Sequence, residues 1–429
     1  MQVPQDTDPY AKASSRYYAL VLLTIIYSFN FIDRQLLAIL QESIKADLGL
    51  SDGQLGLLTG FAFAVFYVTA GLPIARWADR GNRSNIVGLS LFTWSFMTAL
   101  SGFAQNYWHL LLARIGVGVG EAGGSPPSHS IISDIFPPEK RASAMGFYST
   151  GVNIGILFGF LLGGWLNEFF GWRIAFIVVG APGVLLALLV WLTLPEPIRG
   201  MADAKQKEIE HSSFKDVISL LWQSRCFRYL ALGASLQAFA SYASSNWMAS
   251  FIIRSYNMPT GELGTWLALT MGLAGAIGVF GGAVLADKLA LTDKRWYAWL
   301  PTIAGFICVP FIIASFLVDD VYLVLSLTII PGLLFNVYLG TTIATTHSLV
   351  GARMRATASA ILFLILNIIG LGLGPSSVGI ISDFLQSSLG IESLRYAMLS
   401  VIPAAVFLSA CCFYLAAKTL RQDVANAPS

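Results

Sequence analysis

Four ionisable residues lie deep inside long apolar stretches of the chain, where such side chains are rare. Asp33 and Arg34 are in the first stretch, and Arg114 and Glu121 are in the fourth. A charge at the centre of a bilayer costs about 2.5–3.5 kcal/mol on insertion scales, so such residues normally pair or face a cavity. Burial favours the neutral acid and a nearby arginine favours the carboxylate, so both acids are candidates for reversible protonation.

The spacing of these residues predicts how deep in the membrane each acid and each arginine lies. At about 1.5 Å per residue, Asp33 and Arg114 each lie about 10 Å from the same side of the membrane. Glu121 is on the same helix face as Arg114 and about 10 Å deeper. We predict a proton switch in which protonation of Asp33 breaks its pair with Arg114 or Arg34, and Glu121 is a second proton site. The alternative is a set of static salt bridges, and the sequence leaves open which arginine meets which acid.

The composition indicates which elements must position these residues. Of the 429 residues, 55% are hydrophobic and 12% are charged, whereas a soluble domain carries about 25% charged residues. A transmembrane helix needs about 20 apolar residues. The sequence therefore predicts an all-α integral membrane protein with twelve transmembrane helices. The predicted spans are at about residues 17–40, 54–76, 84–104, 107–132, 142–167, 173–194, 227–251, 262–286, 296–317, 321–348, 356–381 and 394–417.

The basic residues predict the orientation of these spans. With both termini on one side, that side holds 20 of the 26 lysines and arginines, while two lie within spans and four on the other side. The positive-inside rule then places both termini in the cytoplasm. The polar first residues do not resemble a cleavable signal peptide. The short loops suggest a bacterial inner-membrane protein.

The longest loop, residues 195–226, predicts a division into an N-terminal six-helix bundle at 1–194 and a C-terminal one at 227–429. Around residues 214–222 this loop is amphipathic. That pattern indicates either a short helix at the cytoplasmic interface or a plain linker.

The two predicted bundles share short motifs in register. Ala75-Arg-Trp-Ala-Asp79-Arg80 follows the second span, and Ala283-Val-Leu-Ala-Asp287-Lys288 follows the eighth. Arg141-Ala-Ser-Ala matches Arg355-Ala-Thr-Ala, and the glycines of spans five and eleven also correspond. Three matches at offsets of 208 to 215 residues indicate an internal repeat, in which a substrate site lies midway between the halves.

Two of these motifs resemble those of the major facilitator superfamily. Gly71 to Arg83 is similar to its cytoplasmic signature, with Ala75 in place of the leading Gly and Asn82 in place of the Gly before Arg. The run Gly146-x8-Gly155-x3-Gly159-x3-Gly163-Gly164 resembles the span-five motif of exchangers. Phe160 stands where that motif has Pro, which weakens the inference of exchange.

A narrower resemblance is to the Spinster family of lipid-related transporters. It rests on Asn30-Phe-Ile-Asp33-Arg34, Asp79-Arg80-Gly-Asn82-Arg83, Arg114-Ile-Gly-Val-Gly-Val-Gly-Glu121-Ala and Ile131-Ile-Ser-Asp134-Ile-Phe136. The superfamily resemblance covers the whole chain, and the Spinster resemblance is confined mainly to the first half. It implies that the four charges within the spans take part in proton coupling.

Charged residues at the predicted cytoplasmic helix ends are a second candidate group. The superfamily resemblance implies that they latch the two bundles of a half together in the outward-open state, whereas the alternative is that they only follow the positive-inside rule. Acids at matching positions in both repeats favour the latch. The group is Asp79, Arg80, Arg83, Asp287 and Lys288.

The central helices of each half are the candidates for lining a substrate cavity. An arginine-bearing end and aromatic walls would suit an amphipathic anion, because arginine is suited to phosphate and carboxylate. Taken singly, most of these side chains could equally serve packing alone. The candidates are Tyr27, Asn30, Phe66, Tyr67, Gln237, Tyr242, Asn246, Trp247, Asn336, Tyr338 and Thr342.

The sequence therefore predicts a proton-coupled secondary transporter and not an enzyme. We find no nucleophile–base pair, and the glycines around Gly120 follow no strand and precede no Gly-Lys-Ser/Thr, so they favour helix packing over nucleotide binding. Cysteines and histidines lack metal-ligand spacing. We expect no cofactor and no nucleic-acid partner, a monomer in membrane lipid, and protons and a lysolipid or sphingoid phosphate as ligands. The alternatives are a transporter of small organic anions or drug-like solutes, and a channel.

Overall fold

A computed structural model describes residues 9–200, 214–351 and 354–426, and within these ranges every regular element is helical. Seven helical runs are long and apolar enough, by length and composition, to cross a membrane. Some of these runs contain more than one predicted span, and three predicted spans are too polar or too short to meet that criterion. Together the described helices cover all twelve predicted spans, which confirms the expected all-α membrane fold.

The chain divides into two compact units. The first comprises Met1–Gly49 and Ala62–Glu208, and the second comprises Leu50–Phe61 and Ile209–Ser429. The segment Leu50–Phe61, at the start of the second predicted span, thus packs with the second unit. Residues 201–213 of the predicted linker lie outside the described residues.

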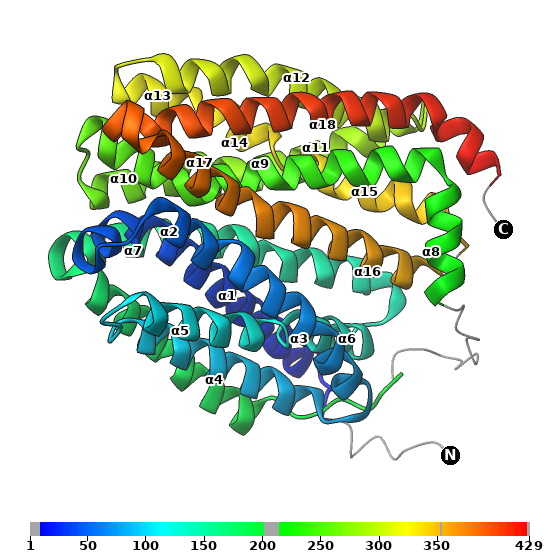
Figure 1. The fold of residues 1–429 in the computed structure, drawn as a ribbon. Coiled ribbons are helices and arrows are strands. Elements are labelled where there is room, and N and C mark those ends of the chain that lie inside the picture. The colour runs from blue at the N-terminus through cyan, green and yellow to red at the C-terminus, as the bar shows by residue number, and fades with distance from the viewer. Residues whose placement is uncertain (1–8, 201–213, 352–353, 427–429) are drawn as a thin grey trace. The chain divides into compact units, whose positions relative to one another are not determined.

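The first unit contains the helices that carry the four charges predicted to lie within the spans. Figure 1 shows α7 running alongside α1, and α4 beside α5. The polypeptide reverses within α7 at Gly171, whose φ of 80° is open to glycine. Two predicted spans are thereby joined without a loop. The helices are α1 (Ala13–Leu48), α3 (Phe61–Arg80), α4 (Arg83–Ser101), α5 (Tyr107–Glu121), α6 (Ser125–Ile135) and α7 (Pro138–Thr193).

The glycines of α7 allow it to approach α1 closely. A Cβ atom at Gly151 would lie 2.8 Å from the Thr24 carbonyl oxygen, and one at Gly159 would lie 2.8 Å from Cβ of Gln35. These glycines belong to the run that resembles the exchanger motif. In this structure they bring the backbones of α1 and α7 together, as small residues do at helix interfaces in lipid.

The second unit contains more interrupted helices. Two predicted spans contain π-helical turns, η2 (Ala268–Leu273) and η4 (Asn367–Leu373), and the tenth span is broken into three pieces. Such turns often mark functional positions in membrane helices. The remaining helices are α2 (Asp52–Thr59), α8 (Phe214–Gln223), α9 (Arg225–Tyr256), α10 (Thr260–Leu267), α11 (Ala274–Ala290), α12 (Trp296–Leu317), α13 (Val321–Leu327), α14 (Ile329–Leu334), α15 (Val337–Ser348), α16 (Arg355–Leu366), α17 (Gly374–Leu389) and α18 (Ser393–Ala425), with a short 3-10 turn, η5 (Gly390–Glu392).

The amphipathic segment of the linker forms the helix α8. Its residues Val217 and Leu221 are buried in the apolar core of the second unit with Phe227 and Leu230, while Trp222 is exposed. The most buried apolar positions of α8 therefore contact protein, which explains the pattern without requiring a helix that lies on the membrane.

Candidate proton and substrate site

An ion pair between two of the predicted proton-coupling residues joins α1 to α5. Arg34 Nε donates to Glu121 Oε2 at 2.8 Å, and a terminal nitrogen of Arg34 lies 2.7 Å from the same oxygen. The Glu121 side chain is fully buried, whereas that of Arg34 is 12% exposed. Asn30, one turn before Arg34, also acts on the Glu121 carboxylate through its side chain. The sequence left the pairing open, and the structure assigns Arg34 to Glu121.

Three aromatic rings surround the Arg34 guanidinium. Its central carbon lies 5.0 Å from the ring centres of Phe31 and Phe63 and 5.3 Å from that of Tyr67. Cations are attracted to ring faces at such distances, so the rings hold the arginine in place while leaving part of it accessible. The Arg114 guanidinium lies 5.1 Å from the Phe63 ring, on which both arginines therefore converge.

Asp33 does not form the predicted pair with Arg114 or with Arg34. Its Oδ2 accepts a hydrogen bond from the Thr98 hydroxyl of α4 at 3.0 Å. The reason is helical geometry, because consecutive residues point about 100° apart. Arg34 faces α5 and α3, and Asp33 faces α4. Thr98 was missed because a threonine in an apolar helix carries no signal in the sequence.

Three atoms of this cluster are buried without a hydrogen-bond partner among the described residues. They are Asp33 Oδ1, Arg114 Nε and Glu121 Oε1. Asp33, Arg114 and Glu121 are each exposed by 3% or less. Buried polar groups are normally satisfied, and exceptions often belong to functional sites. One donor and two acceptors are thus available here to bind a proton, water or a ligand.

The predicted latch residues of the first unit separate into two kinds. Asp79 and Arg80 are exposed at the end of α3. Arg83 is buried and bonds Asp134 at the end of α6 and Glu196 beyond α7, the latter at 2.7 Å. Arg83 therefore joins helices within its own unit. Glu196 lies between two prolines at the end of a span, a position that the sequence interpretation passed over.

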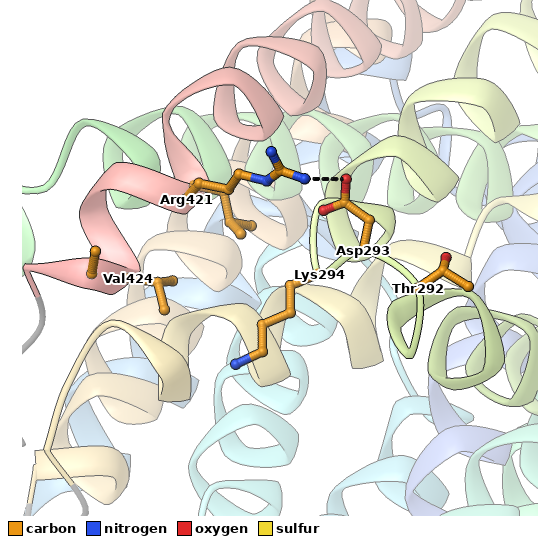
Figure 2. Close-up of a pocket in the computed structure, with 7 residues that line it drawn as sticks. Thr292, Asp293, Lys294, Arg421 and Val424 are labelled. Atoms are coloured by element: carbon orange, nitrogen blue, oxygen red, sulfur yellow. Dashed lines mark hydrogen bonds and ion pairs between the residues drawn. The ribbon is translucent and has the colours of Figure 1, made fainter.

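The matching residues of the second unit, Asp287 and Lys288, are exposed at the end of α11. Asp287 accepts a hydrogen bond from the Tyr297 hydroxyl at 3.1 Å. Beside them, a pocket of about 340 Å³ lies between the loop before α12 and the end of α18 (Figure 2). Figure 2 shows Arg421 pointing toward Asp293, to which it is bonded at 2.9 Å. This pocket contains none of the predicted site residues.

Asp52 forms a further buried ion pair, which the sequence did not single out. Its two carboxylate oxygens accept from Arg254 of α9 at 2.6 and 2.7 Å, and one also accepts from Ser382 at 2.6 Å. The Asp52 and Gly53 amides, at the start of α2, donate to the Asp383 carboxylate at 2.9 and 2.8 Å. All these residues belong to the second unit.

The predicted cavity residues also differ in their surroundings. Tyr27 stacks on Tyr148, with ring centres 4.5 Å apart, and Tyr67 contacts Arg34. In the second unit Trp247 is fully buried and donates to the Pro375 carbonyl at 2.8 Å, and Tyr338 is in the apolar core, so both are packing residues here. The other candidates are half-buried, except that Phe66 is exposed and Asn30, Gln237 and Thr342 are buried.

The fold and this buried charge cluster define a multi-pass membrane transporter. The family model of the Major Facilitator Superfamily matches residues 23–375, and the chain belongs to that superfamily. A solved bacterial homologue of the human lysosomal transporter Spinster, in an inward-facing and unoccupied conformation, superimposes with a TM-score of 0.88 at 34% identity, covering 96% of this chain and 99% of that one. The resemblance to Spinster is thus confirmed.

Curated relatives differ in the solutes that their names give. An MFS-type efflux pump of Mycolicibacterium smegmatis is 32% identical over 99% of both chains. A sphingosine-1-phosphate transporter of Danio rerio is 28% identical over 93% of this chain and 86% of its own. A probable galactarate/D-glucarate transporter of Bacillus subtilis is 29% identical over 73% of this chain and 74% of its own.

Proposed function

We propose that this transporter couples proton movement to the transport of an amphipathic, lipid-like anion such as a lysophospholipid or a sphingoid phosphate. The observation that carries the proposal is the Arg34–Glu121 pair, which is set among aromatic rings and lies beside the buried Asp33. The similarity to Spinster proteins and to a sphingosine-1-phosphate transporter supports the substrate class.

The pair provides a physical link between a proton and an anion. While Glu121 is ionised it occupies Arg34, and an anionic headgroup must compete with it. Protonation of Glu121 removes the negative charge and frees the guanidinium, which is suited to phosphate and carboxylate. A proton and an anion would therefore bind the same site with positive coupling.

The aromatic residues around Arg34 favour a solute that is apolar beyond its charged end. Phe31, Phe63 and Tyr67 contact the guanidinium itself, and the exposed Phe66 is on the same helix as the last two. An acyl or sphingoid chain next to the headgroup would pack on such rings. We assign Asp33 a second proton site, since it is buried, with only 1% of its surface exposed.

The alternative function is transport of small organic anions or drug-like solutes. It is favoured by the efflux pump and the sugar-acid transporter among the relatives. Such solutes would use Arg34 or the rings, but would not need both. We further propose that both termini are cytoplasmic, that the chain is a monomer in the bacterial inner membrane, and that Asp79, Arg80, Asp287 and Lys288 latch its cytoplasmic side, with Arg83 supporting the latch from within its own unit.

Flux measurements in proteoliposomes test these proposals. The panel contains lysophosphatidylglycerol, sphingosine 1-phosphate, galactarate and a cationic dye, each with and without a pH gradient. Saturable lysolipid or sphingoid flux that the gradient drives supports the main proposal. Gradient-driven flux of galactarate or the dye alone supports the alternative, and non-saturable flux that ignores the gradient contradicts both.

A further inference from the structure

The hydroxyl of Thr98 does not follow the hydrogen-bonding pattern of Thr93 and Ser101 on the same helix. Threonine and serine hydroxyls inside apolar helices usually donate to the carbonyl four residues earlier. On α4, Thr93 donates in this way to Leu89 and Ser101 to Met97, and on α1 Thr24 donates to Leu20. Thr98 instead donates to Asp33 on another helix, and this is its only hydrogen bond among the described residues.

This hydrogen bond is also the only one that Asp33 makes in the described structure. Its other oxygen, Oδ1, is buried and has no partner. A buried carboxylate that lacks a hydrogen-bond donor is strongly unfavourable, whereas a neutral carboxyl group is tolerated. The ionised state of Asp33 therefore depends on Thr98 more than it would in a site with several donors.

The charged groups around Asp33 belong to α5 and to α1 itself. Arg114 and Glu121 of α5 act on it electrostatically, with opposite signs, and Arg34 follows it on α1. Helix α4 carries no charge beyond Arg83 at its first position, and the charged residues of α7 lie toward the ends of its two spans. On the α4 side the surroundings of Asp33 thus contain a single polar contact, the Thr98 hydroxyl.

We propose that Thr98 is a positioning residue for proton coupling, whose hydroxyl holds ionised Asp33 on the α4 side of α1, apart from the Arg34–Glu121 pair. When Asp33 takes up a proton, the hydroxyl can turn to the carbonyl of Trp94, four residues earlier, as the hydroxyls of Thr93 and Ser101 do with their own preceding turn. Asp33 is then free to move toward α5. This inference rests on the proposed proton coupling, because it assigns Thr98 a role in that coupling.

Infrared difference spectroscopy of the reconstituted full-length chain tests this directly. Titration with acid follows the carbonyl stretch of protonated carboxyl groups, and the band missing in Asp33→Asn belongs to Asp33. A hydrogen bond to a carboxylate stabilises its ionised form, so its loss favours protonation. We therefore expect Thr98→Val to move the midpoint of this band by about one pH unit or more toward higher pH. Thr98→Ser, which keeps the hydroxyl, should restore the midpoint.

The matched control is Thr93→Val, which removes a self-satisfied hydroxyl from the same helix and should leave the midpoint unchanged. Thr98→Ala provides a second variant if Val disturbs folding. An unchanged midpoint in Thr98→Val and Thr98→Ala would overturn the assignment. Because this readout needs no solute, it is separate from the flux assay. If flux ignores the pH gradient while the midpoint still moves, the proposed coupling fails and the contact between Thr98 and Asp33 stands.

Discussion

The Asp52–Arg254 pair of the second unit and the Glu121–Arg34 pair of the first unit are satisfied to different degrees. In the second unit, both oxygens of Asp52 and both oxygens of Asp383 accept hydrogen bonds, from Arg254, Ser382 and the first amides of α2. In the first unit, Glu121 uses one oxygen for Arg34 and leaves the other without a partner. One network is complete and the other is not.

The difference indicates distinct roles. A complete network fixes one arrangement, since any movement loses several hydrogen bonds together. The start of α2, an N-terminal helix end that favours negative charge, adds to this by holding Asp383. An incomplete network can accept a proton or an anion without first breaking a full set of bonds. We therefore interpret the Asp52 group as structural and the Glu121 group as the functional one.

The largest expected effect is a loss of proton-driven transport in the variant Glu121→Gln. Glutamine removes the ionisable group but keeps the shape, so gradient-driven flux should fall roughly tenfold to a hundredfold. Binding of an anionic solute should persist, because Arg34 loses its competitor. Flux and binding in proteoliposomes check this, with the exposed Glu168→Gln of α7 as the control. Full gradient-driven flux in Glu121→Gln would remove this residue from the coupling role.

The second-largest expected effect is a loss of folding stability in the variant Arg254→Gln. Removing one partner of a buried pair leaves an uncompensated charge and costs about 3–5 kcal/mol. Thermal unfolding of the detergent-solubilised protein should show a clear drop in Tm. Arg421→Gln is the control, because that arginine is 66% exposed and exposed pairs contribute about 0–1 kcal/mol. Equal shifts in the two variants would contradict a structural role for the Asp52 group.

A smaller loss is expected for Arg83→Lys. Arg83 uses three nitrogens, which reach Glu196, Asp134, Ser130 and the Pro197 carbonyl. Lysine cannot match this planar geometry, so about 1–3 kcal/mol of stability should be lost. Arg80→Lys, three residues earlier and exposed, should leave Tm unchanged. A stable Arg83→Lys variant would argue that the bonds around Arg83 contribute little to stability.

The smallest effect concerns pH and Asp293, in the loop before α12. Hydrogen bonds from Arg295, and the charge of Arg421, lower the pKa of Asp293 from its ordinary 3.8 to about 2. A lowered pKa adds stability that is present above the ordinary value and is lost as the pH falls toward 2. The difference in Tm between the native chain and Asp293→Asn should therefore be constant from pH 5 to pH 8. A difference that disappears by pH 5 would contradict this.

Much of the fold follows from the sequence alone. Twelve apolar stretches, the repeated motifs and the glycines of span five are local patterns, and each corresponds to helices or close helix contacts in the structure. The interruptions within spans were harder to predict. The break before Ser125 accompanies Pro126 and Pro127, and the π-helical turn η4 directly precedes Gly374-Pro375. The π-helical turn η2 carries no comparable signal.

The four buried charges were identified by sequence, because an ionisable residue within an apolar span is conspicuous whatever surrounds it. Their partners were decided by tertiary structure. Which face of α1 meets α4 and which meets α5 depends on how the helices are rotated and packed. Turning α1 by about 100° about its axis would place Arg34 where Asp33 now points. The role of Thr98, like that of Asp52, arises only from a neighbour that is distant in the chain. For that reason residue type and spacing could identify the acids, but only the packed helices could show which donors they meet.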